Sequence, residues 1–201
     1  MNKQTRYCYS LAQGVLREKA IRLHHQRYEE VGFFKKGEAD PYESVSTYFA
    51  AQTDGNEIVG VTRLIFGKLE DLPTMKNFKI YDIERAKLNQ LDRRRFAEIS
   101  AFTKMPAHDW SAGLIKTVLQ YSLNIGLTHW ICCIDERVYN YMYRMVKFPF
   151  KEIGVRQVYL GSVTIPCVLN LSEFLANLKV HRPSLFQYFT QQDAGLLEVS
   201  L

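Results

Sequence analysis

Residues 93–104, RRRFAEISAFTK, carry the side chains with the clearest chemical potential in this chain. We interpret 95–104 as a β-strand, with the carboxylate of Glu98 at its centre and three arginines at its start. A carboxylate can accept a proton during a reaction. It can equally form an ordinary ion pair, here with Arg63 or Arg95. The segment alone leaves both interpretations open.

The cysteines and histidines give no indication of a metal site. Cys132 and Cys133 are adjacent in an apolar run, so we expect their side chains on opposite faces of a strand. Cys8 and Cys167 are isolated, no CxxC pair occurs, and no histidines stand at metal-ligand spacing. We therefore expect buried free thiols, no metal and no tightly bound cofactor.

Composition indicates a single domain of ordinary size. The chain has 201 residues, 47% hydrophobic and 23% charged, as is usual for a soluble globular protein. No stretch approaches the ~20 apolar residues that cross a membrane. The first ten residues, MNKQTRYCYS, lack the apolar centre of a signal peptide. We expect a cytoplasmic protein with no integral membrane segment.

The formal charge of +5 restricts the partners. A modest positive charge is compatible with nucleic acid, a membrane surface or an acidic protein. The basic residues are scattered except for Arg93, Arg94 and Arg95, and no nucleic-acid-binding motif is present. An acidic protein or an anionic substrate suffices, and we expect no nucleic-acid partner.

The order of predicted elements indicates a mixed α/β (α+β) fold. We predict an amphipathic helix over 11–31, a loop over 32–46, and a hairpin of strands 47–53 and 57–66 joined by Asp-Gly-Asn. A short helix is expected near 81–88. Strand 95–104, helix 111–126, strand 127–135 and a helix over 136–148 follow, and then a hairpin over 155–171 and helices on both sides of Pro183. The strand–helix–strand unit implies parallel pairing, and therefore a mixed sheet flanked by helices.

This order, together with EISAFTK, resembles the GNAT superfamily. It resembles more narrowly the long-chain N-acyl amino acid synthases and the autoinducer (acyl-homoserine-lactone) synthases. The resemblance runs from about residue 10 to 175. Four stretches carry it: RLHHQRYEEVGF with DPYE at 40–43, EIVGVTRLIF with Arg63, EIS with Glu98, and YMYRMVKFPFKEIG with Tyr143. It implies one GNAT acyltransferase domain over 1–201, with a mostly antiparallel twisted sheet and a helical tail over 176–201.

The resemblance implies roles in acyl transfer for two of these residues. Glu98 would face the acceptor amine, which arrives protonated near neutral pH and needs a base. Tyr143 would protonate the leaving thiolate, a modest contribution because a thiol has a pKa near ~8.5. The alternative for Tyr143 is a packed aromatic side chain, since Tyr139 and Tyr141 stand beside it.

The resemblance also implies where the acyl donor binds. Strand 95–104 would splay from its parallel neighbour, and its backbone would hold the thioester and pantetheine arm around Ser100, Ala101, Phe102 and Lys104. Residues 105–114, with Ser111, Ala112 and Gly113, would meet a phosphate at the start of the helix. The single glycine there departs from the glycine-rich acetyl-CoA signature. We therefore expect an acyl carrier protein as donor, with acyl-CoA as the alternative. Because carrier proteins are acidic, the candidate contacts are basic: Arg93, Arg94, Arg95, Lys104 and Lys116.

Four residues are implied to bind the acceptor: Asp40, Glu43, Arg63 and His24. Asp40 and Glu43 match an acidic pair of the autoinducer synthases, and the alternative for both is a solvated loop charge. Arg63 would hold an acceptor carboxylate, or pair with Glu98. His24 and His25 are equally compatible with ordinary surface positions.

Two differences from the autoinducer synthases restrict the choice of acceptor substrate. The autoinducer synthases have arginines where this chain has Ala101 and His24, which argues against S-adenosylmethionine and favours an amino acid. We expect an N-acyltransferase that joins a fatty acyl chain to an amino acid. An autoinducer synthase and a catalytically silent module that binds carrier protein or lipid are the alternatives. An acyl tunnel is a further expectation, although a hydrophobic core would use the same side chains: Phe33, Phe34, Phe66, Phe78, Phe102 and Trp130.

Overall fold

The computed structural model describes residues 6–105 and 111–191, apart from the side chain of Lys104. It divides them into two units. The first contains residues 6–64 and 101–118, and the second contains residues 65–100 and 119–191. Strand β4 (Phe96–Lys104) and helix α4 (Ser111–Asn124) each contribute residues to both units.

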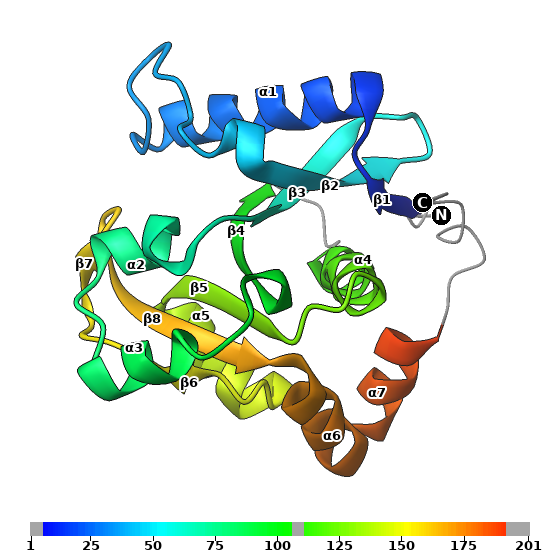
Figure 1. The fold of residues 1–201 in the computed structure, drawn as a ribbon. Coiled ribbons are helices and arrows are strands. Elements are labelled where there is room, and N and C mark those ends of the chain that lie inside the picture. Colours follow the sequence, from blue (N-terminus) through cyan, green and yellow to red (C-terminus); the bar gives the residue numbers. More distant parts are fainter. Residues whose placement is uncertain (1–5, 106–110, 192–201) are drawn as a thin grey trace. The chain divides into compact units, whose positions relative to one another are not determined.

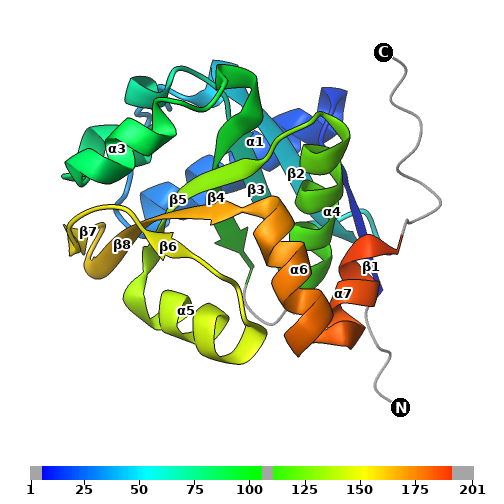
Figure 2. The same ribbon diagram turned by 60° about the horizontal axis from the view of Figure 1, so that its bottom comes forward.

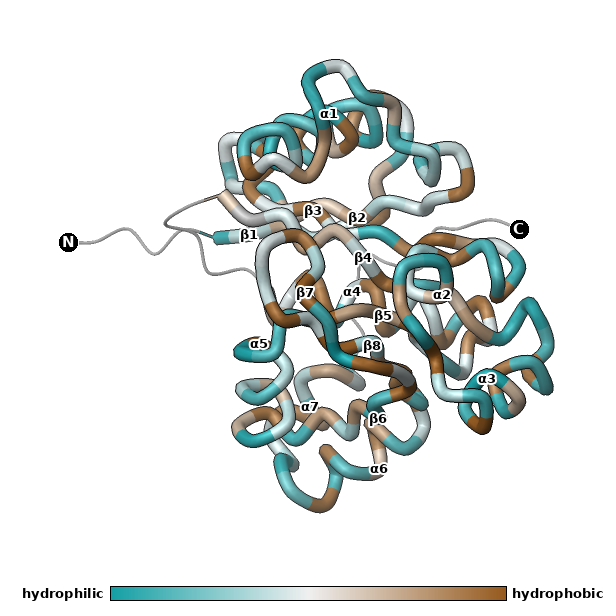
Figure 3. The backbone as a smooth tube through the Cα atoms, turned by 90° about the vertical axis from the view of Figure 1, so that its left-hand side faces the viewer, coloured by the Kyte–Doolittle hydropathy of each residue, from teal (hydrophilic) through white to brown (hydrophobic). Residues whose placement is uncertain are grey.

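The first unit combines β-strands with helix α1, and it also contains parts of β4 and α4 (Figure 1). Its strands β1 (Tyr7–Leu11), β2 (Ser46–Thr53) and β3 (Ile58–Ile65) lie in sequence order, followed by β4. Helix α1 (Gly14–Glu30) packs on β2 through Ala20, which contacts a buried cluster with Tyr48 and Ala50. Hydrophobic residues are interspersed among hydrophilic ones in α1 (Figure 3), and its buried residues, Ala20 and His24, are four positions apart and share one face of the helix.

The hairpin prediction is confirmed. The N–H of Thr53 donates to the carbonyl of Glu57 at 2.9 Å, and the N–H of Asn56 donates to Thr53 at 2.9 Å. Asn56 has a φ of 60°, a left-handed conformation that asparagine tolerates better than most residues. The predicted loop before this hairpin contains a short 3₁₀ turn, η1 (Glu43–Val45). Strand β1 was not predicted; it pairs antiparallel with β2, with Tyr7 opposite Thr53.

The second unit is built around β5 (His129–Asp135) and β8 (Ser162–Asn170), which pair antiparallel from His129 opposite Asn170 to Asp135 opposite Thr164. Parallel pairing between β4 and β5, as predicted, joins Phe96 to His129. Two short strands, β6 (Lys151–Glu152) and β7 (Gln157–Tyr159), pair with β8. The remaining elements are η2 (Leu69–Asp71), α2 (Pro73–Asn77), α3 (Asp82–Leu88), η3 (Arg93–Arg95), α5 (Glu136–Tyr141), the π-helix η4 (Met142–Val146), α6 (Leu171–His181) and α7 (Pro183–Thr190).

Aromatic packing explains the predicted helical tail. The rings of Phe148 and Phe174 lie 4.2 Å apart between centroids, and Phe174 and Phe189 lie 5.8 Å apart. These contacts join α6 and α7, which lie side by side in Figure 2. Helical structure continues to Thr190, and the last part of the predicted tail, 192–201, lies outside the described residues.

The predicted fold class is confirmed: eight strands form a mixed, mostly antiparallel sheet with helices against it. Sequence patterns missed the short elements β1, β6 and α2, and the change from α-helix to π-helix after Tyr141. Among the described residues, no helix has both the length and the apolar character needed to span a membrane.

Ala101 interrupts the regular geometry of β4. Its φ is +58°, and its side chain is 5% exposed. For a residue with a Cβ, the left-handed conformation costs about 1–2 kcal/mol. Glycine removes that cost, whereas in a regular strand it lowers stability by roughly 0.5–1 kcal/mol relative to alanine.

We expect Ala101→Gly to leave the free energy of unfolding unchanged or to raise it. Ala97→Gly is the matched control, because Ala97 is buried in the same strand without a positive φ. The control should lose about 1 kcal/mol. Urea denaturation of both variants checks this, and equal losses would show that Ala101 is not strained.

Candidate active site

Glu98 is buried at the point where the pairing of β4 with β5 ends. Glu98 is 1% exposed. The parallel pairing of the two strands ends with Glu98 opposite Ile131, whereas β5 continues to Asp135. Both carboxylate oxygens accept the backbone N–H of Thr74, at 3.2 Å for Oε1 and 2.9 Å for Oε2. The Thr74 hydroxyl donates to Oε1 at 2.8 Å. Glu98 therefore lies at the last residue of the parallel pairing with β5, and the divergence of the strands that the resemblance implies stays a prediction.

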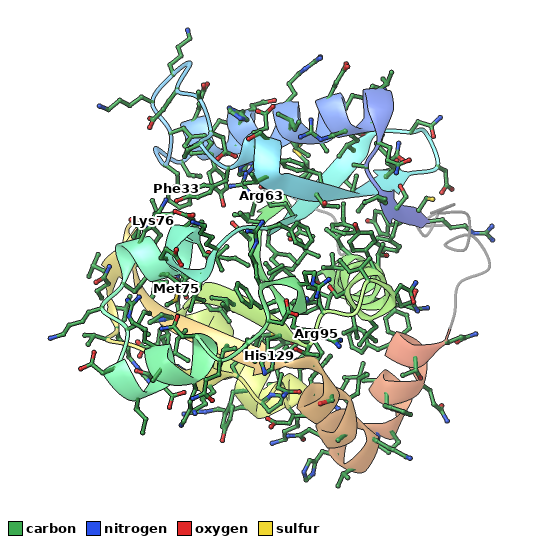
Figure 4. All side chains as sticks on the ribbon, viewed as in Figure 1. Phe33, Arg63, Met75, Lys76, Arg95 and His129 are labelled. Carbon is green, nitrogen blue, oxygen red and sulfur yellow. The ribbon has the colours of Figure 1, made fainter. Side chains whose placement is uncertain are left out.

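The two ion pairs considered for Glu98 are replaced by other contacts. Arg63, labelled in Figure 4, donates from Nη1 to Asp40 and to the hydroxyl of Tyr48. Arg95 donates to the backbone carbonyl of Gly126 at 3.1 Å. The predicted alternative, in which Glu98 pairs with Arg63 or Arg95, is therefore wrong.

Three of the four predicted acceptor-binding residues form one buried cluster in the first unit. His24 is 0% exposed, Arg63 3% and Asp40 7%. Oδ2 of Asp40 accepts from Arg63 and lies 3.5 Å from Nε2 of His24, and Oδ1 accepts the N–H of Tyr42 at 3.0 Å. The interpretation of His24 as a surface histidine is wrong, because its ring packs 4.1 Å from that of Tyr28.

The electrostatics of this cluster follow from burial and pairing. Burial alone would raise the pKa of Asp40, but its contact with His24 and the charge of Arg63 hold that pKa well below its usual range. Burial lowers the pKa of His24. Asp40 is therefore ionised and His24 neutral at neutral pH. Nδ1 of His24 and Nε of Arg63 are buried with no hydrogen-bond partner among the described residues, and such atoms often mark a ligand or water position.

Glu43 is the predicted acceptor residue that stays accessible. Its side chain is 40% exposed and lies 3.5 Å from Nε2 of His25. Its backbone carbonyl accepts from Arg17 at 3.0 Å, which fixes the chain at η1. Glu43 therefore presents a carboxylate to solvent close in sequence to the buried Asp40.

The predicted donor-binding residues are only partly described. Ala101 is buried with its positive φ, Phe102 is 47% exposed, and Ser111 and Ala112 are exposed at the start of α4. The Lys104 side chain and residues 106–110 lie outside the described residues. These observations leave the donor assignments as predictions.

Gly113 has a packing role that sequence reasoning missed. A Cβ at this position would lie 2.2 Å from Cζ of Tyr9, so the ring of Tyr9 lies against the first turn of α4. The strand β1 that carries Tyr9 has the alternating sequence YCYSL, a signal that could have revealed it. The structure thus gives a reason for glycine here besides phosphate binding.

Tyr143 lies on the π-helix η4 and is 53% exposed, so its interpretation as a packed core aromatic is wrong. Its ring is parallel to that of Tyr139, with centroids 6.1 Å apart and an angle of 3°. π-helical turns occur often at functional sites. An accessible phenol is compatible with proton donation to a leaving group, and the catalytic role stays a prediction.

The basic candidates divide into two groups. Arg93, Arg94 and Arg95 are exposed on η3, where Asp92 accepts the N–H of Arg94 at 2.8 Å. Lys116 is 4% exposed. Its predicted contact with a carrier protein is therefore incorrect, because a docking protein meets side chains at the surface.

The three cysteines of β5 and β8 are poor nucleophiles. All four cysteines of the chain are free, and Cys8 is exposed, contrary to the expectation of four buried thiols. Burial and the neighbouring Glu98 carboxylate raise the pKa of Cys133 to about 12. Burial also raises the pKa of Cys132 and Cys167. Since the thiolate is the reactive form, an acyl-cysteine intermediate at these three residues is disfavoured. Within the described part of the chain, no group of three or more potential ligands could hold a metal ion.

The residues expected to line an acyl tunnel belong to separate packing groups. Phe33 and Phe34 contact Tyr28 near the end of α1. Phe78 packs on Tyr159 at 5.2 Å, and Trp130 donates to the Ser122 hydroxyl at 2.9 Å. Phe78 and Trp130 are buried, whereas Phe33 and Phe34 are half-buried and Phe102 is 47% exposed.

A pocket of about 210 Å³ occurs in the second unit, with Lys87, His129 and Asn170 in its wall. None of the predicted site residues lines it. We therefore place the candidate active site at Glu98 and not at this pocket, because Glu98 is a buried carboxylate at the end of the β4–β5 pairing. Thr74 and Tyr48, which bind Glu98 and Arg63, are the other residues that sequence reasoning missed.

Comparison with known proteins found a matching family and similar solved structures. Residues 19–172 match the family described as N-acyl amino acid synthase FeeM. The structure of FeeM, an N-acyl amino acid synthase from uncultured soil microbes, is 20% identical with a TM-score of 0.63, covering 87% of this chain and 96% of that one. The acyl-homoserine-lactone synthase LasI is 14% identical with a TM-score of 0.62, over 84% of this chain and 91% of its own.

A third similar structure is BjaI, a CoA-dependent acyl-homoserine lactone synthase solved with SAM and isopentyl-CoA. It is 14% identical with a TM-score of 0.62, over 92% of this chain and 88% of its own. No curated protein sequence matches the chain. These likenesses support the GNAT acyltransferase fold.

The buried His24 makes the stability of the first unit sensitive to acid. Unfolding restores an ordinary histidine pKa of about 6.5, above the lowered value in the folded chain. The unfolded chain therefore binds the proton first, and stability is lost as pH falls below about 6.5. We expect His24→Asn to show a smaller decrease in the free energy of unfolding between pH 7 and pH 5 than the unmodified protein. Urea denaturation at several pH values measures it, and parallel curves would contradict this view of His24.

Proposed function

Because the chain belongs to the N-acyl amino acid synthase family, we propose that it is an N-acyltransferase that moves an acyl group from a thioester to the amino group of an amino acid. The observation that carries this proposal is the buried, hydrogen-bonded carboxylate of Glu98 at the end of the β4–β5 pairing. A carboxylate in that place can take a proton from an amine beside a thioester held on the diverging strand.

The nitrogen loses two protons in the reaction and the sulfur gains one. Glu98 accepts the first proton from the protonated amino group, directly or through water, and the nitrogen lone pair then attacks the thioester carbonyl carbon. A C–N bond forms and the C–S bond breaks, and the second amine proton passes to water. The thiolate leaves and takes a proton from solvent or from the phenol of Tyr143, whose exposure supports this role.

The donor we favour is an acyl carrier protein. The segment that would meet a phosphate has one glycine, Gly113, and that glycine accommodates the ring of Tyr9. A pantetheine arm attached to a protein carries a single phosphate, which makes smaller demands on this segment than coenzyme A does. The exposed Arg93, Arg94 and Arg95 provide charge complementarity to an acidic carrier. Acyl-CoA is the alternative donor.

The acceptor proposal rests on the first unit. Arg63 already pairs with Asp40, but its Nε and the Nδ1 of His24 are buried donors or acceptors without a partner among the described residues. They are candidates to bind an acceptor carboxylate. Glu43 is the accessible carboxylate that suits the amino group. Ala101 and His24 stand where the autoinducer synthases have arginines, which favours an amino acid over S-adenosylmethionine.

Mass spectrometry tests the activity directly. The purified protein is incubated with palmitoyl carrier protein and mixed amino acids, and N-acyl amino acids are sought. Product that requires S-adenosylmethionine would indicate an autoinducer synthase instead. Carrier binding without any product would indicate a silent binding module.

In the same assay we expect Glu98→Gln to lower kcat by about 100-fold or more, the usual range for loss of a general base, with the fold retained. Glu84→Gln is a matched control. Glu84 is also buried, at 8% exposure, but it pairs with Lys87 and Lys151, so its variant should keep kcat. Unchanged turnover in Glu98→Gln would remove Glu98 from the mechanism.

Charge reversal tests the carrier protein. We expect the double variant Arg93→Glu/Arg94→Glu to raise KM for the acyl carrier protein by about tenfold, since rim charges guide association, and to leave KM for acyl-CoA unchanged. Lys19→Glu/Arg22→Glu reverses two exposed charges on α1 as a control. An equal effect of both double variants would argue against a docking role for η3.

A further inference from the structure

We propose that Thr74 is the positioning residue for Glu98, fixing the carboxylate in the orientation from which it receives the amine proton. This inference rests on the proposed function, because it concerns the same acyl-transfer site. Thr74 lies on α2, an element that sequence analysis did not predict. The contact brings together residues 24 positions apart in the chain.

Thr74 provides hydrogen-bond donors to both carboxylate oxygens of Glu98. Thr74 donates its N–H to both oxygens of Glu98, at 3.2 and 2.9 Å, and its hydroxyl to Oε1 at 2.8 Å. Thr74 is 0% exposed and Glu98 1% exposed, so solvent does not compete for these bonds. Donors on both oxygens oppose rotation of the carboxylate about its last side-chain bond.

The local sequence explains why Thr74 has a donor to offer. Pro73 occupies the first position of α2, and Thr74 follows it. The first N–H groups of a helix have no partner within the helix, so the N–H of Thr74 is available to Glu98. Burying a carboxylate without hydrogen bonds would be costly. The contact therefore gives the N–H of Thr74 an acceptor and the buried carboxylate of Glu98 a donor.

Hydrogen bonds hold α2 and the residues after it against residues 154–157 of the second unit, and they therefore restrict the position of Thr74. Nε2 of Gln157 donates to the carbonyl of Asn77 at 2.6 Å at the end of the helix. The N–H of Val155 donates to Lys79 at 2.8 Å. Gly154 permits this approach, because a Cβ there would lie 2.5 Å from the Lys79 carbonyl oxygen. The carboxylate therefore depends on a loop fastened to the β7–β8 region.

The same contacts would serve a different purpose if Glu98 only capped α2. In that case loss of the Thr74 hydroxyl would affect stability and leave turnover unchanged. A positioning role predicts instead that kcat falls while KM for the acyl donor stays the same. It also predicts that the effect disappears once Glu98 can no longer act as a base.

The experiment compares Thr74→Val, Thr74→Ser and the double variant Thr74→Val/Glu98→Gln in the N-acyl amino acid assay. We expect Thr74→Val to lower kcat by about 10- to 100-fold, part of a general base contribution, with KM for the acyl donor unchanged. Thr74→Ser, which restores the hydroxyl, should remain within about threefold of the unmodified protein. Adding Thr74→Val to Glu98→Gln should change kcat by less than about twofold, because both act through one group.

Thr164→Val is the matched control. Thr164 is 4% exposed and its hydroxyl donates to the carbonyls of Tyr159 and Ser162, away from Glu98, so turnover should be kept. If Thr74→Val does not fold, Thr74→Ala replaces it, with circular dichroism to confirm folding. An active unmodified protein whose Thr74→Val variant keeps kcat, or whose double variant loses activity multiplicatively, overturns the positioning role. An inactive unmodified protein would instead reject the proposed function.

Discussion

The burial of two carboxylates, Asp40 in the first unit and Glu98 in the second, is the constraint on which much of this structure depends. A buried carboxylate must be paired or hydrogen-bonded, since an uncompensated charge is costly to remove from water. Asp40 is compensated by a cation, Arg63, and by its contact with His24. Glu98 accepts hydrogen bonds from the backbone N–H and the hydroxyl of Thr74. The two solutions have different chemical consequences.

A carboxylate paired with arginine is stabilised in its charged form and is a weak base. The low pKa of Asp40, which follows from its contact with His24 and the charge of Arg63 despite burial, is an example. Asp40 therefore serves to hold Arg63 in position, whereas the donors of Thr74 orient the carboxylate of Glu98.

The strand arrangement determines what Glu98 can meet. Parallel pairing joins Phe96–Glu98 of β4 to β5, and ends there, while β5 remains paired with β8 along its whole length. The thiol of Cys133, on β5 beyond that point, has a pKa raised to about 12 by burial and by Glu98. Direct attack of an amine on the thioester fits these observations better than a covalent acyl-enzyme.

The sequence by itself determined the long elements, the hairpin at Asp54–Asn56 and the mixed sheet, because hydrophobic periodicity and turn residues are local signals. Glu98 was selected as the residue of interest through the resemblance to known acyltransferase families. The sequence could not determine side-chain partners. Whether Glu98 meets an arginine or Thr74, and whether His24 is at the surface or buried, depends on residues distant in the chain. The short elements β6 and α2 carry too few residues for a periodic signal, and α2 holds Thr74, which donates to Glu98. Only tertiary structure decided these points, because burial and hydrogen bonding arise when separate segments pack together.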